Sequence, residues 1–286
     1  MEGSNIAPTA PAEIAALDGA ARRHLAPCGA GEMVWRQWGE GMAVVLLHGG
    51  YGSWGHWLRN IPALATRYRV IVPDLPGLGE SAMPPPTDHL DDISDIVFDG
   101  LTTVLAPGAP FHLVGFSFGG HLAGRIAVRA GGRLRSLTLV GAGGLGLPRV
   151  GRAGAALGRV ARGMSDSEIA ALQRDNLAKF MFHDPAKIDE AALWLQIENV
   201  KRGRFKSIPF AQGDRLAQAL PLITAPLAGI WGEFDITAHP HLDQRAALLH
   251  KYQPEAPFHV VAGAGHWVQY EAAAEFNRLL RDFLDP

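Results

Sequence analysis

Residues 113–120 of the sequence read Leu-Val-Gly-Phe-Ser-Phe-Gly-Gly. A short apolar run leads into this stretch and an amphipathic run leaves it, so it joins a predicted strand to a predicted helix. Gly115, Ser117 and Gly119 form the pattern G-x-S-x-G. In so tight a turn the positions two residues before and two residues after the serine must lack side chains. The serine hydroxyl is then exposed at the helix N-terminus. We therefore predict that Ser117 is a nucleophile; a structural turn that contains a serine by chance is the alternative.

Further short apolar runs, each followed by a turn that contains glycine, recur along the chain. The predicted buried strands are residues 42–47, 69–72, 111–114, 134–140, 226–231 and 258–261. The amphipathic stretches between them are residues 54–65, 91–105, 118–130, 241–252 and 270–284. Strands that alternate with helices predict an α/β fold with a mostly parallel sheet flanked by helices. An earlier stretch, residues 34–38, is expected to be an antiparallel edge strand.

The alternation stops after Gly143 and resumes near residue 223, which predicts an inserted helical lid over residues 144–222. Ser165 and Glu168 have capping-box spacing at the start of one lid helix, and a second is expected over residues 189–200. An insertion between two parallel strands lies above their carboxyl ends, where open α/β sheets bind ligands. Residues 29–143 and 223–286 are then one catalytic domain. Residues 1–28 are expected to be an N-terminal arm with a surface helix.

A serine hydroxyl is a poor nucleophile unless a neighbouring base takes its proton. The strand that ends at Trp231 is followed by Asp235, and the last strand is followed by a glycine-rich loop that carries His266. The chain order Ser117, Asp235, His266 is that expected when all three side chains project from one edge of such a sheet. Glu233, two positions earlier in the same turn, is the rival for the acid. We predict a Ser117–His266–Asp235 catalytic triad.

Acyl chemistry also requires backbone donors for the developing oxyanion. The glycine-rich residues 48–52 follow the first long strand and can supply one donor, which we assign to Gly50, with Tyr51 as the adjacent alternative. The second donor is predicted to be the Phe118 amide at the start of the next helix. The loop lacks both the G-x-G-x-x-G pattern and the lysine of a phosphate-binding loop, so no nucleotide cofactor is expected.

The composition narrows the classes of partner. In 286 residues, 26 Lys and Arg balance 28 Asp and Glu, for a net charge of −2, so the overall field favours neither nucleic acid nor an anionic membrane. A single cysteine, Cys28, and the lack of a spanning apolar run predict a cytoplasmic protein. His239 and His241 flank a proline, which favours a structural role over a metal site. We expect a small-molecule substrate and no cofactor, and the sequence leaves homo-oligomerisation open.

These motifs together resemble the α/β-hydrolases with a helical lid, over about residues 33–286. Within that superfamily the chain is most similar to the meta-cleavage-product hydrolases, which cut a carbon–carbon bond beside a ketone in ring-fission products of aromatic catabolism. The similar stretches are residues 48–50, 74–81, 115–119, 141–146, 265–271 and 275–280, together with Asp235. The resemblance implies a serine hydrolase, and it implies that Trp267 lines the substrate pocket.

Two positions depart from that family. It usually carries an asparagine before the nucleophile, where this chain has Phe116, and a substrate-binding arginine on a lid helix, where this chain has Gln196. The predicted substrate-binding residues are Trp267, Gln196 and Tyr51. Cleavage of a ring-fission-type diketone is the leading expectation. A carboxylesterase or lactonase would need the same triad without the asparagine and arginine, and a non-catalytic small-molecule receptor on the same scaffold is the alternative of another class.

Overall fold

The structure is a computed structural model that describes residues 10–147, 157–207, 210 and 213–285. Its centre is an eight-stranded sheet in the order β1-β2-β4-β3-β5-β6-β7-β8. The strands are β1 Arg22–Cys28, β2 Gly31–Trp38, β3 Met42–Leu47, β4 Tyr68–Pro73, β5 Phe111–Phe116, β6 Leu134–Val140, β7 Leu227–Gly232 and β8 Phe258–Val261. β2 pairs antiparallel with β1 and with β4, and the pairs from β4 to β8 are parallel. The six predicted parallel strands are confirmed.

The N-terminal region differs from its prediction. Residues 22–28, assigned to the arm, form the edge strand β1, so β2 is the second strand and not the edge. β1 was missed because its residues alternate between exposed and buried and include two arginines and a proline, instead of forming an apolar run. The predicted surface helix is present as α1 Ala12–Gly19. Residues 1–9 of the predicted arm lie outside the described residues.

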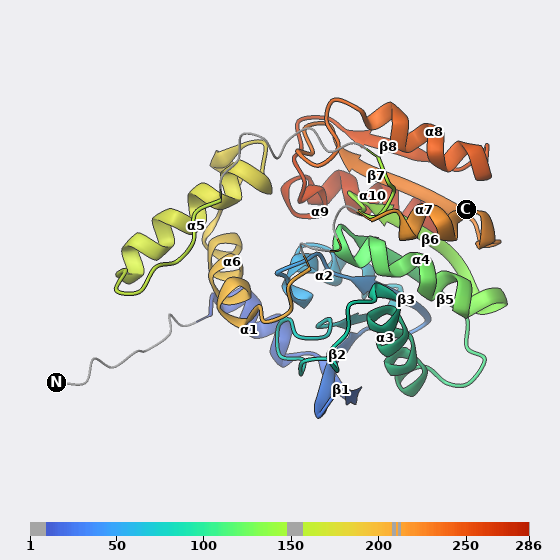
Figure 1. The fold of residues 1–286 in the computed structure, drawn as a ribbon, viewed down its shortest axis with the longest axis horizontal. Helices are drawn as coiled ribbons and strands as arrows, with labels where there is room; N and C mark the ends of the chain where they lie inside the picture. The colour runs from blue at the N-terminus through green and yellow to red at the C-terminus, as the bar shows by residue number, and fades with distance from the viewer. Residues whose placement is uncertain (1–9, 148–156, 208–209, 211–212, 286) are drawn as a thin grey trace.

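Helices cover both faces of the sheet (Figure 1). The helices are α2 Ile61–Leu64, α3 Leu90–Val104, α4 Phe118–Ala130, α7 Arg215–Ala219, α8 Leu242–Tyr252, α9 Val268–Glu271 and α10 Ala273–Leu284, with α1 as above. One core cluster joins α3, α4, α7 and α8 to one face, and a second joins α1, α2, α9 and α10 to the other. The stretch 54–65, predicted as one helix, is a 3-10 turn, Trp54–Trp57, followed by α2, because Pro62 cannot continue a helical hydrogen-bond ladder. The stretch 270–284, also predicted as one helix, lies in α9 and α10, which are separated at Ala272.

Two helices, α5 Asp166–Phe180 and α6 Glu190–Arg202, lie between β6 and β7 in the segment predicted to be the lid. The predicted capping box is present, since the Ser165 hydroxyl accepts from the Glu168 amide and the Glu168 carboxylate accepts from the Ser165 amide. The lid lies to one side of the sheet, and α5 projects away from it (Figure 1). α7, which falls within residues 144–222, packs instead on α4 beside Gly124. Residues 148–156, 208–209 and 211–212 of the predicted lid lie outside the described residues.

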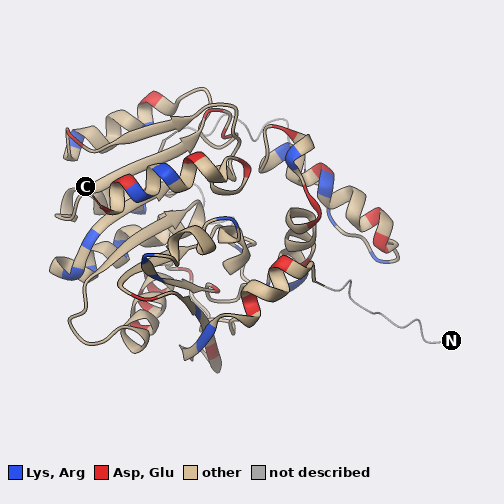
Figure 2. Ribbon diagram, turned by 180° about the vertical axis from the view of Figure 1, so that it is seen from behind, with Lys and Arg blue, Asp and Glu red and all other residues tan. Residues whose placement is uncertain are grey.

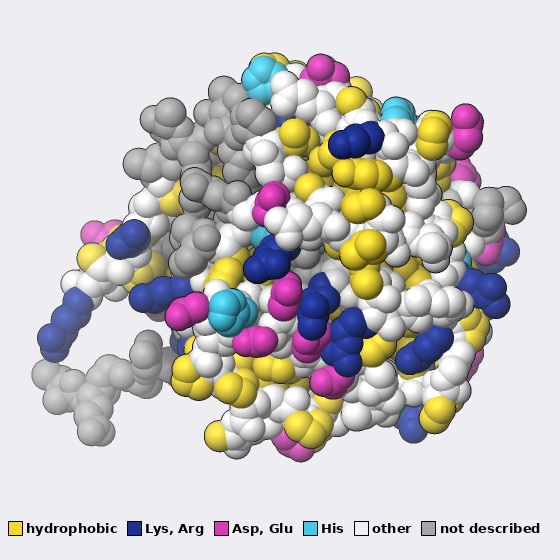
Figure 3. All heavy atoms as spheres, turned by 45° about the vertical axis from the view of Figure 1, so that its right-hand side comes forward, with side chains coloured by type: hydrophobic (Ala, Val, Ile, Leu, Met, Phe, Trp, Pro, Cys, Tyr) yellow, Lys and Arg dark blue, Asp and Glu magenta, His cyan; other side chains and the backbone are white. Residues whose placement is uncertain are grey.

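Charged side chains are spread over the helices, and the strands carry few of them (Figure 2). On the face drawn in Figure 3, several of the described Lys and Arg side chains near the centre stand beside Asp and Glu side chains. Within the described ranges, no helix is both long and apolar enough to cross a membrane.

Candidate active site

The turn between β5 and α4 holds Ser117 in the left-handed region, with φ of 51° and ψ of −111°. Its neighbours show why the predicted glycines are needed. A Cβ on Gly115 would lie 2.6 Å from the Gly120 Cα atom, and a Cβ on Gly119 would lie 2.5 Å from the Leu47 carbonyl oxygen. The Ser117 amide donates to the Val140 carbonyl, which ties the turn to the neighbouring strand. Close backbone packing therefore presents the Ser117 hydroxyl at the carboxyl edge of the sheet.

Ser117, His266 and Asp235 come together at this edge. The Ser117 Oγ atom lies 3.0 Å from His266 Nε2, and His266 Nδ1 lies 2.8 Å from Asp235 Oδ1. Thr237 donates to the same carboxylate oxygen from both its amide and its hydroxyl. Burial raises the pKa of Asp235, but the charge and hydrogen bond of His266 and the two Thr237 donors outweigh it and hold that pKa below its usual value. The rival acid, Glu233, instead accepts from the Gly263 amide.

Residues 49–50 and 117–118, which include the two predicted oxyanion donors, lie close together. A Cβ on Gly49 would lie 3.3 Å from Ser117 Cβ, and one on Gly50 would lie 3.7 Å from Phe118 Cβ. Among the described residues, none accepts a hydrogen bond from the Gly50 or Phe118 amide. Two backbone donors beside the serine hydroxyl are therefore available to an oxyanion. The Ser207 hydroxyl lies against Gly50, only 2.3 Å from where a Cβ would stand.

Two buried histidines fix the Gly49 peptide groups. The Leu75 amide donates to His48 Nε2, so the His48 proton is on Nδ1, from which it is donated to the Gly49 carbonyl oxygen at 2.7 Å. The Gly49 amide donates to His56 Nδ1 at 3.2 Å. Burial lowers the pKa of His48 and lowers the pKa of His56 to well below its usual value. Because the carbonyl of residue 49 and the amide of residue 50 share one planar trans peptide, fixing the former orients the latter.

A cavity of about 350 Å³ borders His266. It lies between the end of α5 and the loops that follow β7 and β8. The residues that line it are mostly apolar or aromatic: Ala178, Lys179, Phe180, Phe182, His183, Phe234, Ile236, His239, Pro240, Gly265 and His266. The Phe180 ring meets the His266 imidazole edge to face, with ring centres 5.3 Å apart. Of the three predicted triad residues only His266 lines this cavity, and an unsaturated or aromatic group would find stacking partners next to it.

The three predicted substrate-binding residues occupy different surroundings. Trp267 is buried, donates from its indole to the His56 carbonyl, and does not line the described cavity. Gln196 lies between the lid helices, where its amide donates to Gln173. Tyr51 is half-buried, has φ of 50°, and contacts Gly203 at the end of α6. The structure thus places none of these three on the cavity beside His266.

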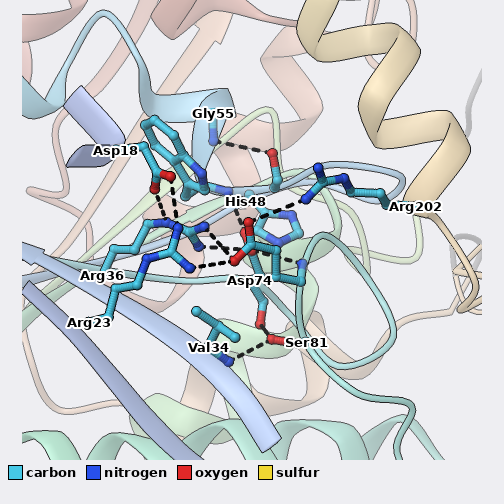
Figure 4. A network of polar contacts seen from close by, with 12 residues as sticks. Asp18, Arg23, Val34, Arg36, His48, Gly55, Asp74, Ser81 and Arg202 are labelled. Atoms are coloured by element: carbon cyan, nitrogen blue, oxygen red, sulfur yellow. Dashed lines mark hydrogen bonds and ion pairs between the residues drawn. The ribbon is translucent and has the colours of Figure 1, made fainter. Parts of the chain in front are cut away.

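A buried ion pair lies next to residues 48–52, which we call the oxyanion loop (Figure 4). Arg36 and Asp74 are both about 1% exposed and lie 3.0 Å apart. Asp74 also accepts from the Trp54 amide, which follows the oxyanion loop, and from the Glu80 amide. The Glu80 carboxylate in turn binds Arg202 at the end of α6. This chain of contacts connects the central sheet to the lid.

Sequence reasoning did not identify His56, Ser207, Thr237 or Glu271. His56 falls in a stretch predicted as a helix, and nothing in its spacing shows that its ring would contact residues 48–52. Thr237 follows Asp235 by two residues, the spacing at which a side-chain carboxylate accepts from a later amide, so this signal was available. Glu271 lies in the stretch 265–271 used for the resemblance, but its contacts depend on a lid segment distant in the sequence.

This arrangement defines a serine-dependent hydrolase. A serine on a tight turn, an imidazole and a buried carboxylate lie at one edge of the sheet, and a helical insertion lies above them. The model of the Alpha/beta hydrolase family matches residues 44–279, and the chain belongs to that family. The predicted fold class and the predicted family are thereby confirmed.

Two curated relatives are similar over most of the chain. A 2-hydroxy-6-oxononadienedioate/2-hydroxy-6-oxononatrienedioate hydrolase of Burkholderia vietnamiensis is 32% identical over 85% of this chain and 86% of its own length. The dihydrolipoyllysine-residue acetyltransferase component of the acetoin cleaving system of Pseudomonas putida is 34% identical over 85% of this chain. The match spans only 64% of that second relative. Among solved structures, a bromoperoxidase of Bacillus anthracis superposes with a TM-score of 0.74, at 22% identity over 93% of this chain and all of that one, which shows a shared fold.

Proposed function

We propose that this hydrolase uses Ser117, His266 and Asp235 to cleave a small carbonyl substrate. As Ser117 Oγ bonds to the substrate carbonyl carbon, its proton passes to His266 Nε2, and the carbonyl electron pair moves to oxygen. The Gly50 and Phe118 amides stabilise that oxyanion. When the tetrahedral intermediate collapses, the bond to the leaving group breaks and His266 returns the proton to it, which leaves the acyl group on Ser117. A water molecule then gives a proton to His266 and attacks the acyl carbon, and the second collapse releases the carboxylic acid as His266 returns the proton to Ser117 Oγ. Asp235 orients the imidazole and stabilises its charged form.

The proposed substrate is a ring-fission-type diketone whose carbon–carbon bond is broken. In such a compound the leaving carbon is conjugated, so the electron pair released on cleavage is delocalised and needs no metal ion. The Burkholderia relative is named for a dienedioate of this kind. The observation that carries the proposal is the aromatic cavity beside His266, where Phe180 and Phe182 can pack against a planar conjugated chain. The end of α5, which lines the cavity, would shield part of it from water.

Ester or lactone hydrolysis is the second candidate, and two contacts favour it. Gln196, at the position where the resembled family has its substrate-binding arginine, is hydrogen-bonded to Gln173 within the lid. Phe116 stands where that family has an asparagine, and its ring packs on His266 at 5.0 Å. An ester needs neither missing group.

Initial rates on short p-nitrophenyl esters, lactones and vinylogous 1,5-diketones distinguish the two candidates. The proposal predicts that the diketones are preferred in kcat/KM by more than about 100-fold, a transition-state difference of about 2.7 kcal/mol. A preference for esters or lactones would contradict carbon–carbon cleavage while retaining the triad. Binding of all three classes without turnover would contradict both and identify a receptor.

A further inference from the structure

Glu271, the last residue of α9, has a carboxylate that accepts from three backbone amides. Its Oε1 atom lies 2.7 Å from the Asp184 amide nitrogen and 3.1 Å from that of His183. Its Oε2 atom lies 2.6 Å from the Gly265 amide nitrogen and 3.1 Å from that of His183. The residue is 7% exposed, so these donors stand in for water around a buried charge.

The three amides belong to two segments that meet only in the folded chain. His183 and Asp184 are in the lid hinge, which we define as residues 181–184 after α5. Gly265 is in the histidine loop, which we define as residues 263–267 and which carries His266. One carboxylate therefore binds backbone amides of both segments, the lid hinge and the histidine loop.

The hinge and the loop are also packed without space between them. A Cβ on Gly265 would lie 2.6 Å from the His183 nitrogen and 2.9 Å from the Met181 carbonyl oxygen. The Trp267 amide donates to that same Met181 carbonyl at 2.8 Å. His266 is thus flanked on both sides, at positions 265 and 267, by residues attached to the hinge. A displacement of the hinge would move the backbone on which the imidazole is mounted.

We propose that Glu271 is a positioning residue that couples the seating of the lid to the orientation of His266. The proposal rests on the proposed function, because it takes His266 as the base. The Oε1 atom binds only the hinge, and the Oε2 atom binds the loop as well as the His183 amide, so an uncharged isostere cannot replace the carboxylate: the amide of a glutamine has one acceptor oxygen, and its NH₂ group would face a backbone donor. Glu271→Gln then retains the volume of the side chain and loses either the bond to Asp184 of the hinge or the bond to Gly265 of the loop.

Glu271→Gln is expected to lower kcat about 10- to 100-fold, since a displacement of catalytic groups by about 1 Å costs about that much. KM should change by less, because the cavity-lining side chains are retained. The matched control is Glu275→Gln on α10, where an exposed carboxylate binds only the Arg278 side chain, and it should leave kcat unchanged. Gly265→Ala would place a methyl group against the hinge backbone and push the hinge away from the loop, so it should reproduce the loss of kcat.

The experiment measures kcat, the rate at which a fluorophosphonate labels Ser117, and amide hydrogen exchange of residues 181–184 and 263–267, all well below the melting temperature. In Glu271→Gln, slower labelling and lower kcat together with faster exchange in either segment support the coupling. Normal kcat and normal labelling in a destabilised Glu271→Gln would assign Glu271 a purely structural role and overturn the proposal. If Glu271→Gln does not fold, Gly265→Ala with unchanged kcat overturns it. A wild-type enzyme that the reagent does not label would instead contradict the triad.

Discussion

Asp235 is the residue on which the charge balance of the site depends. Its carboxylate is buried, and its low pKa shows that the ionised form is favoured there by His266 and Thr237. Asp235→Asn would keep the shape but present an NH₂ group to His266 Nδ1, forcing the imidazole into the wrong tautomer. We expect kcat on a p-nitrophenyl ester to fall by about 10⁴-fold with little change in the circular dichroism spectrum. Thr237→Val should cost much less, and an active Asp235→Asn would mean that another acid supports the base.

Gly50 is restricted by a residue of the segment that follows α6. A methyl group at position 50 would stand 2.3 Å from Ser207 Oγ and would push the oxyanion loop out of place. We expect Gly50→Ala to lower kcat/KM by 10²-fold or more, as loss of an oxyanion donor does. Removing the hydroxyl in Gly50→Ala/Ser207→Ala should recover part of the loss, because the remaining Cβ contact is 3.2 Å. Equal rates for the single and double variants would show that this contact is not the cause.

The sheet and the lid are connected through Asp74, which follows β4. Removing its charge takes from Arg36 its most buried ionic partner and leaves the partly exposed Asp18 and Glu80, so the cost should lie near the lower end of the range of about 3–5 kcal/mol that is typical of breaking a buried pair. We expect Asp74→Asn to lower the free energy of unfolding by about that amount in a urea titration. Asp282→Asn on α10, whose Arg278 partner is exposed, should cost less than about 1 kcal/mol. Similar values for the two variants would mean that the Asp74 network contributes little.

The elements that the sequence predicts well are short runs rich in apolar residues. β3, β6 and β8 have the predicted bounds; β3 and β6 are buried over nearly their whole length, whereas β8 is the opposite edge strand and is mostly exposed. α4 is also as predicted, since its start is set by the tight turn at Ser117. β1 could not be found in this way, because its pairing with β2 is made by backbone hydrogen bonds that any side-chain pattern allows.

The acid stability of the whole molecule depends on buried neutral histidines. The pKa values of His48 and His56 are lowered in the folded state by burial, so the unfolded chain binds more protons below its histidine pKa of about 6.5. Their contribution to stability is complete above that pH and is lost as the pH falls toward the folded pKa values, by up to about 1.4 kcal/mol per pH unit for each group. Urea titrations should show lower stability at pH 5.5 than at pH 7.5. His56→Gln should reduce that difference, and a stability independent of pH in this interval would contradict the neutral assignment.

Over the complete site, the sequence predicts the residues that lie at strand ends. It does not predict the residues whose partners are distant in the sequence. Ser117, Asp235 and His266 were predicted because parallel strands end at one edge. His56 and Glu271 could not be, since their partners at positions 49, 183, 184 and 265 are brought to them only by tertiary packing. Substrate-binding residues are hardest for the same reason, because the inward face of the lid depends on how α5 and α6 sit.

The central claim is that Ser117 is a nucleophile activated by His266. Intact-protein and peptide mass spectrometry after incubation with a fluorophosphonate tests it most directly, because the reagent reacts with serines that have a neighbouring base and an oxyanion site. We expect one adduct, on Ser117, that is absent in Ser117→Ala and forms far more slowly in His266→Ala. No adduct, an adduct on another residue, or equal labelling in wild type and His266→Ala would contradict it.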